Sequence, residues 1–120
     1  MNNDETPGLY VHVPFCRTKC PYCDFYSITS LSFISDWQES LLQEMLAYKN
    51  QCSVFDSLYI GGGTPSVLSE HDLTTLFENL FNNFSFSPNT EITIEANPSD
   101  ITRDKLKHLK AMGVTRISIG

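Results

Sequence analysis

The feature that most restricts the fold of this 120-residue chain is an alternation of strand-like and helix-like segments. Strands are predicted at residues 9–13, 55–60, 91–96 and 116–120, with a helix in each interval between them. Because no two-residue hairpin turn separates consecutive strands, the strands are expected to run parallel, joined by right-handed crossovers. The sequence therefore predicts an α/β fold, a partial TIM-type (β/α) barrel truncated in its fourth strand.

The first helix is predicted over roughly residues 35–49. Ser35 is expected to cap it, and Gln38, three residues further on, completes a capping box. Its apolar stripe is predicted to comprise Trp37, Leu41, Leu42, Met45 and Leu46.

The other two helices carry clear start and stop signals. Ser69 is expected to cap the second helix, with Asp72 at its third position, and Thr102 is expected to cap the third. Gly113 suits the left-handed residue that ends a helix. The predicted buried face of the second helix consists of Leu73, Leu76, Phe77, Leu80, Phe81 and Phe84.

Chemically distinctive residues follow the predicted strands directly. Residues 61–63 are three glycines, which do not suit a strand interior but do suit unusual dihedral angles or a close approach by a ligand. Pro65 fixes the exit from this segment, and Glu95 stands near the end of the third strand. In parallel sheets ligands bind at the carboxyl ends of the strands, so the glycines, Glu95 and the loop after residue 13 are expected to share one rim.

That first loop contains three cysteines, Cys16, Cys20 and Cys23, in a C-x3-C-x2-C pattern. Three such thiolates can hold a cubane iron–sulfur cluster that keeps one iron open to another ligand. Zinc is the alternative, with Cys52 or His12 as fourth ligand, although no second cysteine pair of the structural-zinc kind is present. No apolar signal segment begins the chain, which predicts reduced thiols and a cytoplasmic location.

Composition argues against two classes of partner. A net charge of −6 disfavours nucleic acid, and no apolar run approaches the roughly 20 residues of a membrane span. The one basic cluster, Lys105, Lys107, His108 and Lys110, is interpreted as a solvated helix face. His12, alone in an apolar strand, is more typical of a satisfied core residue than of a ligand and receives no function.

Four sequence strings together resemble the oxygen-independent coproporphyrinogen III oxidase group of the radical S-adenosylmethionine (radical SAM) superfamily, which includes heme chaperones of the HemW type. They are LYVHVPFC at residues 9–16, CPYCDF at 20–25, IGGGTPS at 60–66 and IEANP at 94–98. The resemblance implies that residues 8–120 are the N-terminal part of a radical SAM core domain. Residues 1–7 are polar and are expected to be a disordered lead-in.

By this resemblance Cys16, Cys20 and Cys23 ligate a 4Fe–4S cluster, and Tyr22 packs on the adenine of S-adenosylmethionine (SAM). In the superfamily the amino and carboxylate groups of SAM chelate the open iron. One electron then cleaves SAM to methionine and a 5′-deoxyadenosyl radical. Cys52 lies away from this loop and is expected to be a free cysteine without a function.

The resemblance also implies contacts between SAM and the neighbouring strands. Tyr10 would contact the bound cofactor, Gly62 and Gly63 would receive its ammonium on backbone carbonyls, and Thr64 would add a hydroxyl. Glu95 would face the same cofactor as an anionic partner of a cation. Each has a structural alternative: a tight turn for the glycines, a core position for Tyr10 and a solvent-facing edge position for Glu95.

Three functions follow as candidates. Asp24 and Phe25 follow Cys23, where porphyrin-decarboxylating members carry an additional cysteine, and this favours a heme chaperone that delivers heme to acceptor proteins. Its expected partners are heme or a porphyrin, a reductant protein for the cluster and heme-acceptor proteins. The first alternative is an oxygen-independent coproporphyrinogen III dehydrogenase, and the second is a non-catalytic zinc- or cluster-binding module.

The cysteine pattern makes a prediction that assays of metal content can check. After anaerobic reconstitution, Cys20→Ala should lose iron and sulfide because the loop supplies only three thiolates, whereas Cys52→Ala should retain both. Zinc without sulfide in the wild-type protein, or loss of the centre in Cys52→Ala but not in Cys20→Ala, would contradict the assignment.

Overall fold

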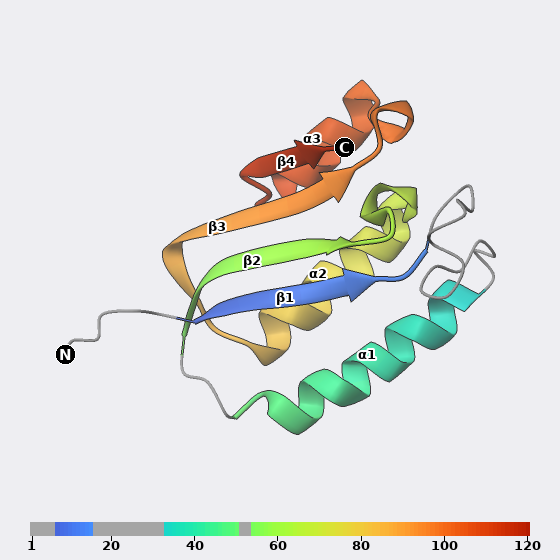
Figure 1. Cartoon of the computed structure of the whole chain (residues 1–120). Coiled ribbons are helices and arrows are strands. Elements are labelled where there is room, and N and C mark those ends of the chain that lie inside the picture. Colours follow the sequence, from blue (N-terminus) through green and yellow to red (C-terminus); the bar gives the residue numbers. More distant parts are fainter. Residues whose placement is uncertain (1–6, 16–32, 51–53) are drawn as a thin grey trace.

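The computed structural model describes residues 7–15, 33–50 and 54–120 (Figure 1). The elements, in chain order, are strand β1 (Gly8–Val13), helix α1 (Ile34–Tyr48), strand β2 (Phe55–Gly62), the short helix η3 (Pro65–Val67), helix α2 (Glu70–Asn83), strand β3 (Phe86–Ala96), the short helix η4 (Pro98–Asp100), helix α3 (Arg103–Ala111) and strand β4 (Arg116–Ile119). The three cysteines of the C-x3-C-x2-C pattern, Tyr22 and Cys52 lie outside the described residues.

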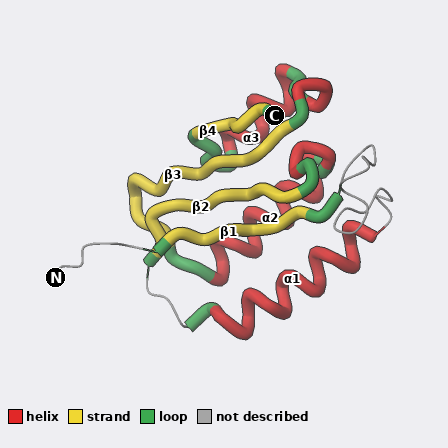
Figure 2. The backbone as a smooth tube through the Cα atoms, viewed as in Figure 1, coloured by secondary structure: helices red, strands yellow, loops and turns green. Residues whose placement is uncertain are grey.

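The four strands form one sheet in the order β1-β2-β3-β4, and each neighbouring pair is parallel. Figure 2 shows the strands side by side, with the helices gathered on one side of the sheet. The parallel topology predicted from the alternation of strands and helices is therefore confirmed. In the described part of the chain, no helix is long and apolar enough to cross a membrane.

The core lies between the sheet and the helices. Val11, Ile60 and Ile94 are neighbours in register on three strands, and each is at most 4% exposed. Helix α2 packs against them with the most deeply buried face, formed by Leu73, Leu76, Phe77 and Leu80. Because successive side chains of a strand point to opposite faces, one set packs against the helices and the other set lies on the opposite face of the sheet.

Two of the predicted helix caps are present. The hydroxyl of Ser69 accepts a hydrogen bond from the backbone N–H of Asp72, and that of Thr102 accepts one from Lys105, each at 3.1 Å. Gly113 has a φ of +106°, as predicted for the residue that ends α3. These features were predictable because each depends on residues only a few positions apart.

The predicted capping box of α1 is wrong. The helix begins after Phe33, which makes no side-chain cap bond, and Ser35 lies exposed within the first turn. Gln38 is 7% exposed and donates its side-chain N–H to the carbonyl oxygen of Asp72 at 2.8 Å. Gln38 thus joins the first turns of α1 to α2 instead of capping α1.

The apolar stripe of α1 is narrower than predicted. Met45 is buried, and Trp37 and Leu41 are partly buried against the core. Leu46 is 45% exposed and points away from the core. Residues four apart face the sheet, so Leu46, one position beyond Met45, turns toward solvent.

An aromatic cluster explains why β3 begins five residues earlier than predicted. Phe86 pairs in register with Phe55, and a register shift follows before Ser57. Phe81 is 41% exposed rather than buried, and its ring packs on those of Phe77 and Phe86 at centroid distances of 5.9 and 5.3 Å. These contacts hold the start of β3 against the end of α2.

The burial of α2 predicts a large difference between two chemically identical substitutions. Leu76→Ala should lower the free energy of unfolding by about 2–5 kcal/mol because it leaves a cavity in a closed core. Leu46→Ala should change it by about 0.5 kcal/mol or less, because Leu46 is exposed. Urea unfolding of the intact protein measures both, and equal effects would contradict the packing described.

Candidate functional site

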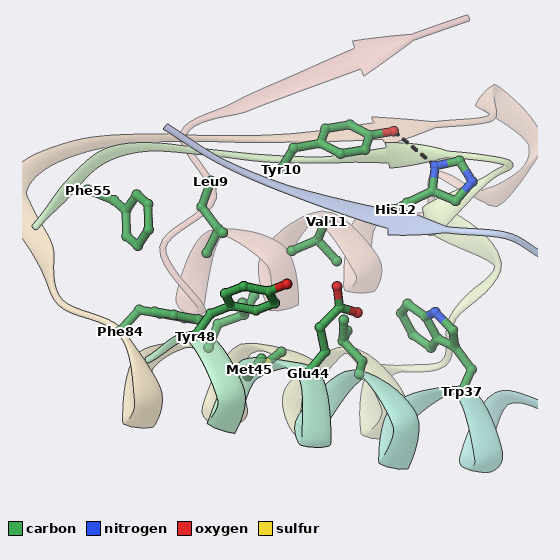
Figure 3. A pocket seen from close by; sticks show the side chains of 12 residues that line it. Leu9, Tyr10, Val11, His12, Trp37, Glu44, Met45, Tyr48, Phe55 and Phe84 are labelled. Atoms are coloured by element: carbon green, nitrogen blue, oxygen red, sulfur yellow. Dashed lines mark hydrogen bonds between the residues drawn. The ribbon is translucent and has the colours of Figure 1, made fainter. Parts of the chain in front are cut away.

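The sheet face opposite the helices presents two neighbouring rows of side chains. Tyr10 and Tyr59 stand side by side in one row, and His12 is paired with Gly61 in the next. Figure 3 shows Tyr10 and His12 on one side of β1, while Leu9 and Val11 point to the helix side. His12 is therefore exposed, and its interpretation as a core residue is wrong.

Tyr10 is also exposed, at 54%, which rules out the core position considered for it. Its hydroxyl lies 3.1 Å from His12 Nδ1, and its ring stacks on that of Tyr59 with centroids 6.0 Å apart and planes 19° apart. The aromatic pair lies on the same open face as the carboxylate of Glu95, which contacts Tyr59 directly.

Glu95 is the centre of this face. Its Oε1 atom accepts a hydrogen bond from the backbone N–H of Gly62 at 3.0 Å, and its Oε2 atom accepts one from the Tyr59 hydroxyl at 2.7 Å. Each carboxylate oxygen is thus held by one donor from β2. Both donors are uncharged, so neither places a positive charge beside the carboxylate.

Gly61 and Gly62 allow the side chain of Glu95 to lie close to the backbone of β2. Contrary to the expectation from sequence, both belong to β2, where they pair with His12 and Val13. A Cβ atom on Gly61 would lie 2.9 Å from Glu95 Oε1. Gly62 has a φ of +114°, and a Cβ there would lie 2.7 Å from His12 Nδ1. Larger residues would force Glu95 or His12 aside.

A cavity of about 290 Å³ opens at the carboxyl ends of β2, β3 and β4. Its lining comprises Gly63, Thr64, Glu95, Ala96, Asn97, Ser118 and Gly120. The structure thus brings together three of the residues singled out in the sequence, Gly63, Thr64 and Glu95, and Gly62 joins them through its bond to Glu95. Tyr10 is not part of the lining and lies in the neighbouring row of side chains, beside Tyr59.

The glycine segment is fastened to the end of β1. The N–H of Gly63 donates to the carbonyl of Val13, and that of Thr64 donates to the carbonyl of Phe15, both at 2.7 Å. Phe15 is the last described residue before Cys16. Phe15 therefore lies beside the glycine segment.

Ser66 joins this segment to the loop after β3. Its hydroxyl donates to Asp100 Oδ2 at 2.9 Å and accepts from the N–H of Asn97 at 3.0 Å. Lys105 donates to the carbonyl oxygens of Ser66 and Leu68 at 2.7 and 2.6 Å. Lys105 is thus part of this network, and its interpretation as a solvated residue is wrong.

Tyr59 was not singled out from the sequence, although period-two alternation places it on the same face as Gly61. The hydrogen bond to Glu95 raises the pKa of Tyr59, with smaller contributions from partial desolvation and from the charge of Glu95, while Ser118 lowers it. The pKa of Tyr10 is raised by partial desolvation and then by the charge of Glu95. Glu95 thus contributes to both shifts, as the main cause for Tyr59 and as the second cause for Tyr10.

A second cavity, of about 430 Å³, lies on the helix side between α1 and β1. Leu9, Trp37, Leu41 and Met45 are among its mainly apolar lining, and Glu44 and Tyr48 of α1 also border it (Figure 3). The body of β1 separates it from the carboxylate. Among the described residues, no group of three or more His, Cys, Asp or Glu side chains is arranged to hold a metal ion.

Comparison with known proteins identifies the family to which this arrangement belongs. A model of the radical SAM superfamily matches residues 10–120. The chain belongs to the radical SAM superfamily. This membership covers β1, the glycine segment and Glu95, so the candidate site lies within the part of the chain that defines the family.

Relatives of this radical SAM chain include two proteins described as heme chaperone HemW. That of Haemophilus influenzae is 39% identical over 94% of this chain and 32% of its own length, and that of Bacillus subtilis is 39% identical over 94% and 31%. A zebrafish (Danio rerio) protein, described as radical S-adenosyl methionine domain-containing protein 1, mitochondrial, is 36% identical over 94% and 26%. The chain spans about a third of the length of the HemW relatives.

Among solved structures, coproporphyrinogen III oxidase (HemN) from Escherichia coli, described as a radical SAM enzyme, matches with a TM-score of 0.87 and 35% identity. The match covers 97% of this chain and 28% of that one. The fold is therefore the predicted α/β type, an arc of parallel strands and outer helices that corresponds to part of a radical SAM barrel.

The contact between Tyr59 and Glu95 predicts a pKa that depends on the carboxylate. Glu95→Gln should bring the pKa of Tyr59 down toward the ordinary tyrosine value of about 10, because the negative charge that holds the proton is removed. NMR titration of ring-labelled tyrosine measures it, with the signal assigned by its loss in Tyr59→Phe. A pKa unchanged in Glu95→Gln would contradict the contact.

The raised pKa of Tyr59 determines how the stability of the fold depends on pH. Because the folded state holds the Tyr59 proton more tightly than the unfolded state, the contact stabilises the fold fully at pH values below the ordinary tyrosine pKa. This contribution is lost as the pH rises through the raised pKa. The contact is thus present throughout the physiological range.

Proposed function

We propose that residues 8–120 are the N-terminal part of a radical SAM core domain, which binds a 4Fe–4S cluster and SAM within a longer protein that handles heme. The observation that carries this proposal is the cavity at the carboxyl edge of the sheet, where Glu95 is held by Gly62 and Tyr59. A carboxylate beside glycine backbone and a hydroxyl suits the amino-acid half of SAM, whose amino group can donate hydrogen bonds and which adjoins the positively charged sulfonium.

The polar groups at the cavity fit this ligand. Glu95 would attract the cationic cofactor, the carbonyls of Gly62 and Gly63 would accept hydrogen bonds from the amino group of SAM, and Thr64 would contribute its hydroxyl. Tyr10 would contact the cofactor from the neighbouring row. A cavity of about 290 Å³ suits part of a cofactor, which is consistent with the remaining part of SAM extending beyond it.

Cys16, Cys20 and Cys23 are the residues we propose as cluster ligands, with Tyr22 packing on the adenine of SAM. The bound cluster would supply the electron for cleavage of SAM. What supports their placement is the anchoring of Phe15 to Thr64, because it starts the cysteine-bearing segment beside the cavity.

For the intact protein we propose heme delivery in the manner of the HemW relatives. Heme, a reductant protein and heme-acceptor proteins would be its partners, in the cytoplasm. The alternative is oxidative decarboxylation of coproporphyrinogen III, the activity named for the structural neighbour. Asp24 and Phe25 after Cys23 favour the chaperone. A non-catalytic zinc- or cluster-binding module would not need a held carboxylate beside the glycine segment.

The deciding experiment uses the intact protein, reconstituted anaerobically with iron and sulfide and supplied with reductant and SAM. We expect SAM to change the EPR signal of the reduced cluster, and we expect stable binding of heme without decarboxylation of coproporphyrinogen III. Release of carbon dioxide with formation of protoporphyrinogen would show the alternative to be correct. A cluster signal that does not respond to SAM would refute the cofactor assignment itself.

A further inference from the structure

We propose that Tyr59 is a positioning residue for Glu95: its hydroxyl holds the carboxylate toward the cavity at the carboxyl edge and thereby sets the affinity for the cationic group bound there. This inference rests on the proposed binding of SAM and extends it to a residue outside the four sequence strings that carry the family resemblance. Tyr59 immediately precedes the string that begins at residue 60.

The geometry assigns this role because Glu95 is held at only two points in the described structure. Gly62 binds one carboxylate oxygen, and a single hydrogen bond leaves the carboxylate free to rotate about the bond that carries it. Tyr59 binds the other oxygen at 2.7 Å, within the range of a strong charge-assisted bond. The two bonds together fix the plane of the carboxylate.

Tyr59 can hold Glu95 because its own ring is held. It stacks on Tyr10 at a centroid distance of 6.0 Å, which restricts the position of its hydroxyl. The side chain is 36% exposed and lies on the sheet face away from the core, so removal of the hydroxyl leaves the packing of the fold unchanged. A Tyr59→Phe variant therefore removes the contacts of the hydroxyl with Glu95 and Ser118 and keeps the ring.

The chemistry of the donor also matters. A lysine or arginine at this position would fix the carboxylate equally well but would cancel its charge. The phenol is neutral, and its hydrogen bond to Glu95 raises its pKa, so it stays protonated and continues to donate. Glu95 is thus oriented by neutral groups and remains able to attract a cation.

The test measures SAM affinity in the intact, cluster-loaded protein, from the SAM-induced change in the EPR signal of the reduced cluster. Tyr59→Phe should weaken binding about tenfold, the loss expected for one hydrogen bond to a charged group. Glu95→Gln should weaken it at least as much. The double variant should bind as Glu95→Gln does, because Tyr59 acts only through the carboxylate.

Tyr48→Phe is the matched control, because Tyr48 is a tyrosine of α1 that is even more exposed than Tyr59, at 54%, and lies on the other side of β1. It should bind SAM as the wild type does, and all variants should hold the same iron and sulfide. Equal affinity of Tyr59→Phe and wild type, or additive losses in the double variant, would overturn the role of Tyr59 while leaving SAM binding intact. Failure of the cluster-loaded wild type to bind SAM would overturn both proposals.

Discussion

The site depends first on the register of β2 between β1 and β3. Because side chains alternate along a strand, this register places Ile60 in the core and Tyr59 on the open face. A slip of one residue would exchange them, and it would also move Gly62 away from Glu95. The burial of apolar side chains under α2 therefore determines which polar groups meet on the other face.

Hydrogen bonds then join the segments that follow β1, β2 and β3 at the carboxyl edge of the sheet. Gly63 and Thr64 are bound to the end of β1, while Ser66 is bound to the start of the loop after β3. The buried bond from Ser66 to Asp100 is costly to leave unmade, since both groups lie away from water. The glycine segment is thus held from both sides.

Sequence reasoning succeeded where the determining contacts are local and failed where they are not. Ser69 and Thr102 were predictable as caps because each acts on a residue three positions away, and the parallel order followed from strand and helix periodicity. Gln38 does not complete a capping box but binds the carbonyl of Asp72, 34 residues away, which no local pattern reveals. Tyr59 was missed for the same reason: its partner lies 36 residues away.

The similarities to heme chaperones and to a coproporphyrinogen III oxidase are nearly equal, at 39% and 35% identity, although the two descriptions name different activities. The fold that both share cannot by itself separate them, and the difference in this segment that favours the chaperone, Asp24 and Phe25 after Cys23, is a sequence marker. The features found at its rim, a carboxylate, glycine backbone and a hydroxyl, suit a cofactor common to the superfamily. We infer that this third of the relatives' length supplies the cofactor site, and that discrimination between heme and porphyrinogen is made by groups that lie elsewhere in those proteins.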